Sequence, residues 1–261
     1  MDKKPIHPLD QPPPPAQPAP ERSPIRRVEV AQITPFLSYT ILVINVVVFL
    51  ADVLLGHQLT DLGAKDNTMI VQGELWRLFT PMFLHAGPIH LAVNSYSLYL
   101  IGPRVERNFG HFRFLALYFL SGIASTIASF AFGPYRSIGA SGALFGLIGA
   151  LIPMFYVNRK VFANTRQQIT RIMVVIAFNL FYGVSAGGID NWAHIGGLVS
   201  GVALAWPTAP RYVLRLITMD TARLDDESSP STAWLIYGLS LLGLGVLTFL
   251  LINLRWSPAG P

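Results

Sequence analysis

The sequence predicts an all-α protein, a polytopic membrane helix bundle with seven transmembrane helices. First, 52% of the 261 residues are hydrophobic and only 13% are charged, whereas soluble domains carry about 25% charged residues. Second, the apolar residues gather in segments long enough to cross a bilayer, which takes about 17–25 residues. Third, Lys and Arg concentrate in alternate connections between these segments, as the positive-inside rule requires.

The expected spans follow one another with short connections. They cover residues 36–55, 82–101, 112–132, 139–157, 172–189, 191–207 and 233–252. The second is the least apolar because it carries His85, His90 and Asn94. The sixth is short and begins almost directly after the fifth.

The chain divides into four parts. Residues 1–35 form an expected disordered, proline-rich cytoplasmic tail, because such a composition cannot bury enough apolar surface to fold. This tail lacks the apolar region of a cleavable signal peptide, and a polyproline ligand for a partner domain is the alternative interpretation. A six-helix core follows at 36–207, then a cytoplasmic linker at 208–232. Residues 233–261 hold the additional C-terminal helix and a short tail, which gives a 6+1 arrangement.

The basic residues predict the orientation. A cytoplasmic N-terminus places fifteen of the 19 Lys and Arg residues on the inner side, and the C-terminus then lies outside. The net charge of +5 is spread over these loops, so it does not indicate nucleic-acid binding. There is no cysteine, which excludes disulfides, thiolate catalysis and Cys-based zinc sites. Together with the lack of an organelle-type presequence, this favours a bacterial inner-membrane protein.

Polar side chains of three spans meet at one depth. In this orientation His85, His90 and Asn94 lie in the outer half of the second span, Ser141 at the outer end of the fourth, and His194 near the outer end of the sixth. Polar groups inside a span are costly and usually functional. A hydroxyl and an imidazole at the same depth predict a serine nucleophile with a histidine base.

Small residues favour close packing of the spans that carry this pair. Gly197 and Gly201 in the sixth span, and Gly142 and Gly146 in the fourth, have the small-xxx-small spacing that lets helix backbones approach. We therefore expect the two polar side chains to come within hydrogen-bond reach, about 2.6–3.2 Å.

Each of these residues also has a simpler interpretation. Ser141 alone could be a helix-packing residue, and His194 alone a buried histidine bonded to a carbonyl. His85 and His90 could be metal ligands, but their i, i+5 spacing does not share a helix face and no His-Glu-x-x-His is present. We therefore expect no metal and no cofactor. The combination at matched depth outweighs the separate alternatives.

The motifs, taken in order, resemble the rhomboid family of intramembrane serine proteases over about residues 36–207. The matching residues are Trp76-Arg77, His85, His90 and Asn94, Glu106 and Gly110, Gly139-Ala140-Ser141-Gly142-Ala143, and Ala193-His194-Ile195-Gly196-Gly197 with Gly201. The resemblance implies that 36–207 is a rhomboid-like catalytic core. Some members of the family add a seventh helix after their six-helix core.

The resemblance also implies roles for the polar residues. Ser141 corresponds to the nucleophile and His194 to the general base of a dyad. His90 and Asn94 correspond to the side chains that stabilise the oxyanion, together with the backbone N–H of Ser141. His85 corresponds to a histidine that supports this region.

Further positions take supporting roles by the same resemblance. Phe145 falls where an aromatic ring packs on the catalytic imidazole; tyrosine is common there in the family, so its hydroxyl is absent here. Gly139, Gly197 and Gly201 support the site. Trp76, Arg77 and Glu106 look structural: an interfacial anchor, and a carboxylate able to satisfy groups beside Arg104 and Arg107.

The predicted function is intramembrane serine endopeptidase activity on transmembrane segments near the outer interface. The implied partners are transmembrane protein substrates and the lipid bilayer, with no nucleic acid. One alternative is a catalytically inactive rhomboid-like protein that binds clients, and a less favoured one is a small-solute transporter. Asp190, four residues before His194, could complete a triad, but at the start of a span we expect it to be an N-cap.

Overall fold

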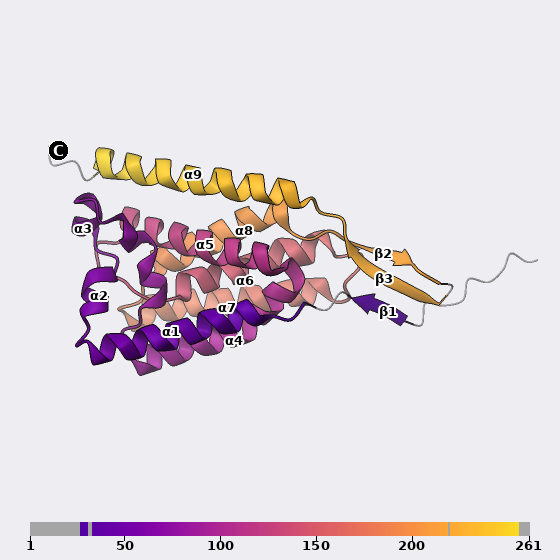
Figure 1. The fold of residues 1–261 in the computed structure, drawn as a ribbon, viewed down its shortest axis with the longest axis horizontal. Coiled ribbons are helices and arrows are strands. Elements are labelled where there is room, and N and C mark those ends of the chain that lie inside the picture. The colour runs from indigo at the N-terminus through magenta and orange to yellow at the C-terminus, as the bar shows by residue number, and fades with distance from the viewer. Residues whose placement is uncertain (1–26, 31–32, 219, 256–261) are drawn as a thin grey trace, which may run out of the picture.

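The computed structural model describes residues 27–30, 33–218 and 220–255, and its body is a bundle of seven long helices (Figure 1). Each long helix overlaps one of the seven apolar segments. The long helices are α1 (Phe36–Leu54), α4 (Pro88–Phe109), α5 (His111–Phe132), α6 (Ser141–Val157), α7 (Thr165–Ala186), α8 (Asn191–Thr208) and α9 (Pro230–Arg255). The polytopic helical bundle is therefore confirmed.

The central helix of the bundle is α6. Nearly all of its side chains are buried, because α5 and α8 pack closely on it; a helix that is apolar all round belongs in an interior. Among the described residues, α1, α5, α7 and α9 are long and apolar enough to cross a membrane by length and composition. α9 runs along one side of the bundle (Figure 1), where it contacts α5 and α8.

The second predicted span begins later than its hydropathy suggested. Residues Thr80–Phe83 form a 3-10 turn, η3, and α4 begins only at Pro88. A proline suits the first position of a helix because its fixed φ is helical and it has no N–H to satisfy. His85 therefore lies in the loop before α4, and its expected place inside a span was wrong.

A three-stranded sheet extends from one end of the bundle (Figure 1). β3 (Thr221–Asp226) is the central strand. It pairs in parallel with β1 (Arg27–Val30) and antiparallel with β2 (Tyr212–Leu216). Ala222 and Leu224 are buried while their neighbour Arg223 is exposed, which is the alternation of a half-buried strand.

This sheet corrects three expectations. The all-α prediction omitted it, and the 208–232 linker proved to contain a β-hairpin. The tail expected to be disordered through residue 35 contributes a strand at 27–30, while residues 1–26 lie outside the described residues. The pairing of β1 with β3 joins segments far apart in sequence, and no local pattern signals such contacts.

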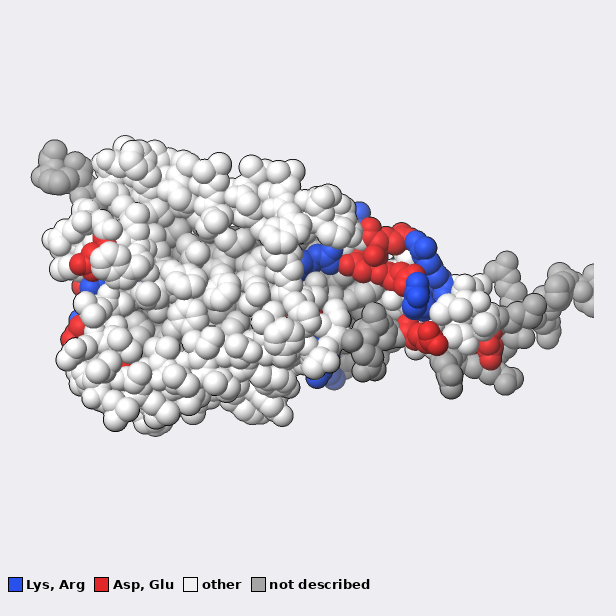
Figure 2. All heavy atoms as spheres, in the orientation of Figure 1, with Lys and Arg blue, Asp and Glu red and all other residues white. Residues whose placement is uncertain are grey.

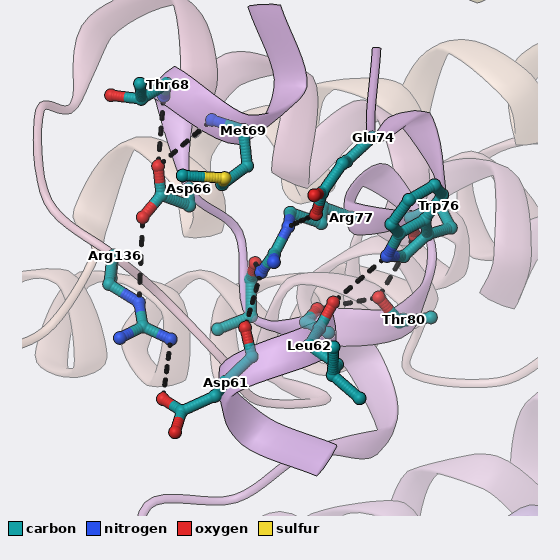
Figure 3. Close-up of polar contacts among 12 residues, drawn as sticks. Asp61, Leu62, Asp66, Thr68, Met69, Glu74, Trp76, Arg77, Thr80 and Arg136 are labelled. Carbon is teal, nitrogen blue, oxygen red and sulfur yellow. Dashed lines mark hydrogen bonds and ion pairs between the residues drawn. The ribbon is translucent and has the colours of Figure 1, made fainter. Parts of the chain in front are cut away.

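The long connection between α1 and α4 folds over the other end of the bundle. It contains α2 (Gln58–Gly63), α3 (Asn67–Val71), η2 (Leu75–Leu78) and η3. Arg77 is buried at its centre and donates to the carbonyls of Asp61 and Ala64, both at 2.9 Å (Figure 3). The indole of Trp76 is half-exposed and donates to the Leu62 carbonyl at 3.0 Å.

Glu106 joins α4 to the start of α1. Its carboxylate accepts from the backbone N–H groups of Leu37 at 3.0 Å and Ser38 at 2.8 Å, which have no partner within their own helix. One of its oxygens also lies 2.7 Å from His111 Nδ1. These contacts agree with the expectation that Glu106, close to Arg104 and Arg107 in sequence, is a structural carboxylate.

Candidate active site

Ser141 and His194 meet where two helices begin. Ser141 is the first residue of α6 and His194 lies in the first turn of α8. His194 Nε2 lies 2.9 Å from Ser141 Oγ, within hydrogen-bond range. The imidazole is almost fully buried. The neighbouring loop between α5 and α6 is tied to the loop before α4, because the N–H of Gly139 donates to the Pro81 carbonyl at 2.9 Å.

The close approach of α6 and α8 makes this contact possible. A Cβ on Gly197 would lie 2.0 Å from the Gly142 carbonyl oxygen, and one on Gly201 would lie 2.0 Å from that of Gly146. These distances are far inside van der Waals contact, so only glycine fits at either position. The small-residue spacing read from the sequence thus corresponds to backbone-to-backbone packing.

Phe145 packs on the His194 ring, and Asp190 caps the helix that carries it. The Phe145 ring stacks on it, with centroids 4.3 Å apart and planes 11° apart. Asp190 caps α8 by accepting from the Ala193 N–H at 3.0 Å, and its other oxygen accepts from the Ser129 hydroxyl. Among the described residues, nothing hydrogen-bonds His194 Nδ1. Asp190 is therefore an N-cap of α8, and its two oxygens are taken by the Ala193 N–H and the Ser129 hydroxyl.

His90 presents a hydrogen-bond donor beside Ser141. Its Nδ1 accepts from the Ala86 N–H at 3.3 Å, so the neutral ring carries its proton on Nε2. A Cβ on Gly139, whose φ is +131°, would lie 2.8 Å from that Nε2 and 3.8 Å from Ser141 Oγ. The donor and the hydroxyl therefore face the same small space, which stays open because residue 139 is glycine.

Asn94 and His85 both contact His90. The buried Asn94 amide donates to the His90 carbonyl at 3.0 Å, which uses one of its two N–H bonds. The buried His85 ring packs edge-on against His90, with centroids 5.3 Å apart. This ring packing is its contact with the site.

The Rhomboid domain family model matches residues 72–211. This range is more than half of the chain, and it includes Ser141, His194 and the residues described around them. The chain belongs to the rhomboid family.

Curated rhomboids similar to this chain come from bacteria and plants. Rhomboid protease GluP of Bacillus subtilis is 48% identical over 160 residues, which cover 60% of this chain and 31% of the relative. RHOMBOID-like protein 1 of Arabidopsis thaliana is 41% identical over 150 residues, covering 57% and 38%. RHOMBOID-like protein 2 of the same plant is 38% identical over 169 residues, covering 63% and 53%. The chain spans about a third to a half of the length of these relatives.

This rhomboid also contains a buried cation near the site that the sequence analysis missed. Lys65 is fully buried between α2 and α3, and its ammonium donates to the carbonyls of Gly133 at 2.8 Å and Tyr135 at 2.9 Å. Its backbone pairs with Ser137, in the loop that leads to Ser141. Burial lowers the pKa of Lys65 to about 8, although Asp190 and Asp66 oppose this shift. A single lysine in a polar connection gives no sequence pattern that predicts such a role.

Proposed function

We propose that this chain is an intramembrane serine endopeptidase that cleaves transmembrane segments near the outer membrane interface. The observation that carries the proposal is the 2.9 Å contact between Ser141 Oγ and His194 Nε2 at the ends of two closely packed helices. The name of the Bacillus subtilis relative, a rhomboid protease, supports the same activity.

In the proposed mechanism, His194 is the general base. Its Nε2 takes the Ser141 proton as Oγ attacks the scissile carbonyl carbon, and the same nitrogen then donates that proton to the leaving amine. A water molecule hydrolyses the resulting ester by the same route. No carboxylate of the described residues contacts Nδ1, so the imidazolium forms against the face of Phe145, which attracts a cation.

Three donors would stabilise the oxyanion. The His90 Nε2–H faces the space beside Ser141, and Asn94 retains one amide N–H. The backbone N–H of Ser141 belongs to the first turn of α6, where N–H groups lack intrahelical partners and the helix dipole is positive. Removal of one such donor typically costs about 2.7–4 kcal/mol of transition-state stabilisation.

The substrate class follows from the membrane. A helix in lipid keeps its peptide groups hydrogen-bonded, so a substrate must unwind locally before Ser141 can reach a carbonyl. Transmembrane segments with glycine, proline or other weak helix formers near the outer interface would unwind at the lowest cost.

The distribution of charge supports the orientation that we propose. Charged side chains gather at the two ends of the molecule, and the middle of the visible face carries none (Figure 2). The end with α2, α3 and the site carries few Lys and Arg residues, whereas the sheet end carries many more. We place the sheet end in the cytoplasm of a bacterial cell and the site toward the exterior.

Cleavage by purified protein tests the dyad. In proteoliposomes with a model transmembrane substrate, Ser141→Ala and His194→Ala should each abolish cleavage, and the double variant should be no worse than either single one. Ser97→Ala is the matched control, because among the described residues the hydrogen bond of this hydroxyl stays within its own helix, at the Val93 carbonyl. Wild-type protein that binds the substrate but never cleaves it would identify a client-binding protein instead.

A further inference from the structure

Two groups of cations lie at the sheet end of the molecule. On the sheet side, Arg113 pairs with Asp226, and Arg223 pairs with Asp225. Arg215 reaches both Asp225 and Glu227. These arginines are therefore largely neutralised within the protein.

Six exposed cations on α4, on α7 and on the connection from α6 to α7 have no such partners among the described residues. This basic cluster comprises Arg104, Arg107, Arg159, Lys160, Arg166 and Arg171. None of them forms an ion pair with any described residue. The sequence explains why: residues 107–189 contain no Asp or Glu, and the nearby Glu106 is fully buried and bonded to α1.

Arg104 marks the point where the three helices meet. It extends from α4 to Gln168 of α7, to which it donates a hydrogen bond. Its guanidinium also lies 4.9 Å from the ring centroid of Phe155 in α6. The other five cations lie on the same ends of these helices or on the connection from α6 to α7.

Aromatic side chains place the basic cluster at headgroup depth. Half-exposed Tyr156 and Trp206 stack with centroids 5.6 Å apart, and Arg159 lies over the Tyr156 ring at 4.7 Å. Such amphipathic rings are enriched where a membrane helix meets the headgroups. Val174 and Phe178 lie one and two turns after Arg171 on α7, and both side chains are exposed. They form an apolar surface that suits acyl chains.

We propose that the basic cluster binds the phosphate headgroups of anionic phospholipids, with their acyl chains against α7. The charge, the depth of the cluster and the adjoining apolar face all fit this occupant. Basic pockets between transmembrane helices bind anionic headgroups in this way. The proposal does not depend on proteolysis and holds for an active or an inactive rhomboid.

Native mass spectrometry of detergent-purified protein tests the proposal. Phosphatidylglycerol should be retained in preference to phosphatidylcholine. The triple variant Arg159→Gln, Lys160→Gln, Arg166→Gln should bind phosphatidylglycerol at least tenfold more weakly, because each cation near an anionic headgroup contributes roughly fivefold. Replacement of the same arginines by lysine, with Lys160 kept, should preserve binding.

The control removes the two exposed sheet-side cations that form ion pairs, Arg215→Gln and Arg223→Gln. It should bind phosphatidylglycerol within about twofold of the wild type. Equal loss in both variants, or equal retention of the two lipids by wild type, would overturn the proposal. Full displacement of the lipid by soluble glycerol phosphate, or tighter binding of an acidic peptide, would also overturn the assignment to lipid. Circular dichroism of each variant verifies that it remains folded.

Discussion

Gly197→Ala should separate α6 and α8, the two helices that carry Ser141 and His194. The new Cβ would lie 2.0 Å from the Gly142 carbonyl oxygen, whereas ordinary contacts begin at 3.4 Å. The obstacle is backbone, so no side chain can rotate away, and α8 must retreat from α6 by about 1.4 Å. His194 is one turn before Gly197 on the same helix.

The consequences for stability and for activity can both be estimated. Forcing an extra methyl group into a packed interior costs about 1–3 kcal/mol. A retreat of that size would stretch the 2.9 Å contact between Ser141 and His194 beyond hydrogen-bond range. A misplacement of about 1 Å at a reacting centre can cost about 10²-fold in rate.

Gly245→Ala in α9 is the control, because among the described residues a Cβ at that position meets no side chain or neighbouring helix within 4 Å. That variant should gain about 0.5–1 kcal/mol from helix propensity. Thermal unfolding in micelles and cleavage of the model substrate measure the two effects separately. Wild-type cleavage together with wild-type stability in Gly197→Ala would refute the packing argument.

Three further predictions concern residues around the site. Burial lowers the pKa of Lys65 from 10.5 to about 8, so between these pH values the unfolded chain binds more protons. The unfolding free energy of wild type should therefore rise relative to Lys65→Met by about 3 kcal/mol from pH 8 to 10.5; a difference that stays flat in unfolding titrations contradicts this. Asp190→Asn should keep near wild-type turnover, while Asp190→Ala should cost about 1 kcal/mol of stability in thermal melts; a loss near ~10⁴-fold for Asp190→Asn would make it a triad member. Asn94→Ala should lower kcat more than it raises KM in steady-state cleavage assays; a change in KM alone would make Asn94 a positioning residue.

The helices could be predicted because each one is an apolar segment of membrane length. The start of α4 could not be placed, since a 3-10 turn and the Gly87-Pro88 step interrupt a segment that hydropathy treats as continuous. The sheet was missed for a different reason. β1 pairs with β3 across most of the chain, Arg27 opposite Thr221, and such contacts leave no local periodicity.

Part of the candidate site could also be predicted from patterns within single helices. Ser141 and His194 could be brought together by matching their depth in the membrane and by the glycine spacing of their helices. The N-cap role of Asp190 could be predicted because aspartate is a preferred residue at the start of a helix. Lys65 could not be found, because its burial results from the loops that fold over it and not from its own neighbours in sequence.

Covalent labelling tests the central claim most directly. A fluorophosphonate probe reacts with a serine hydroxyl that a base activates, and mass spectrometry identifies the residue that carries the adduct. The account predicts an adduct on Ser141 in wild-type protein and its loss in His194→Ala. An unlabelled Ser141 in folded wild-type protein, or equal labelling in His194→Ala, would contradict the proposed pair.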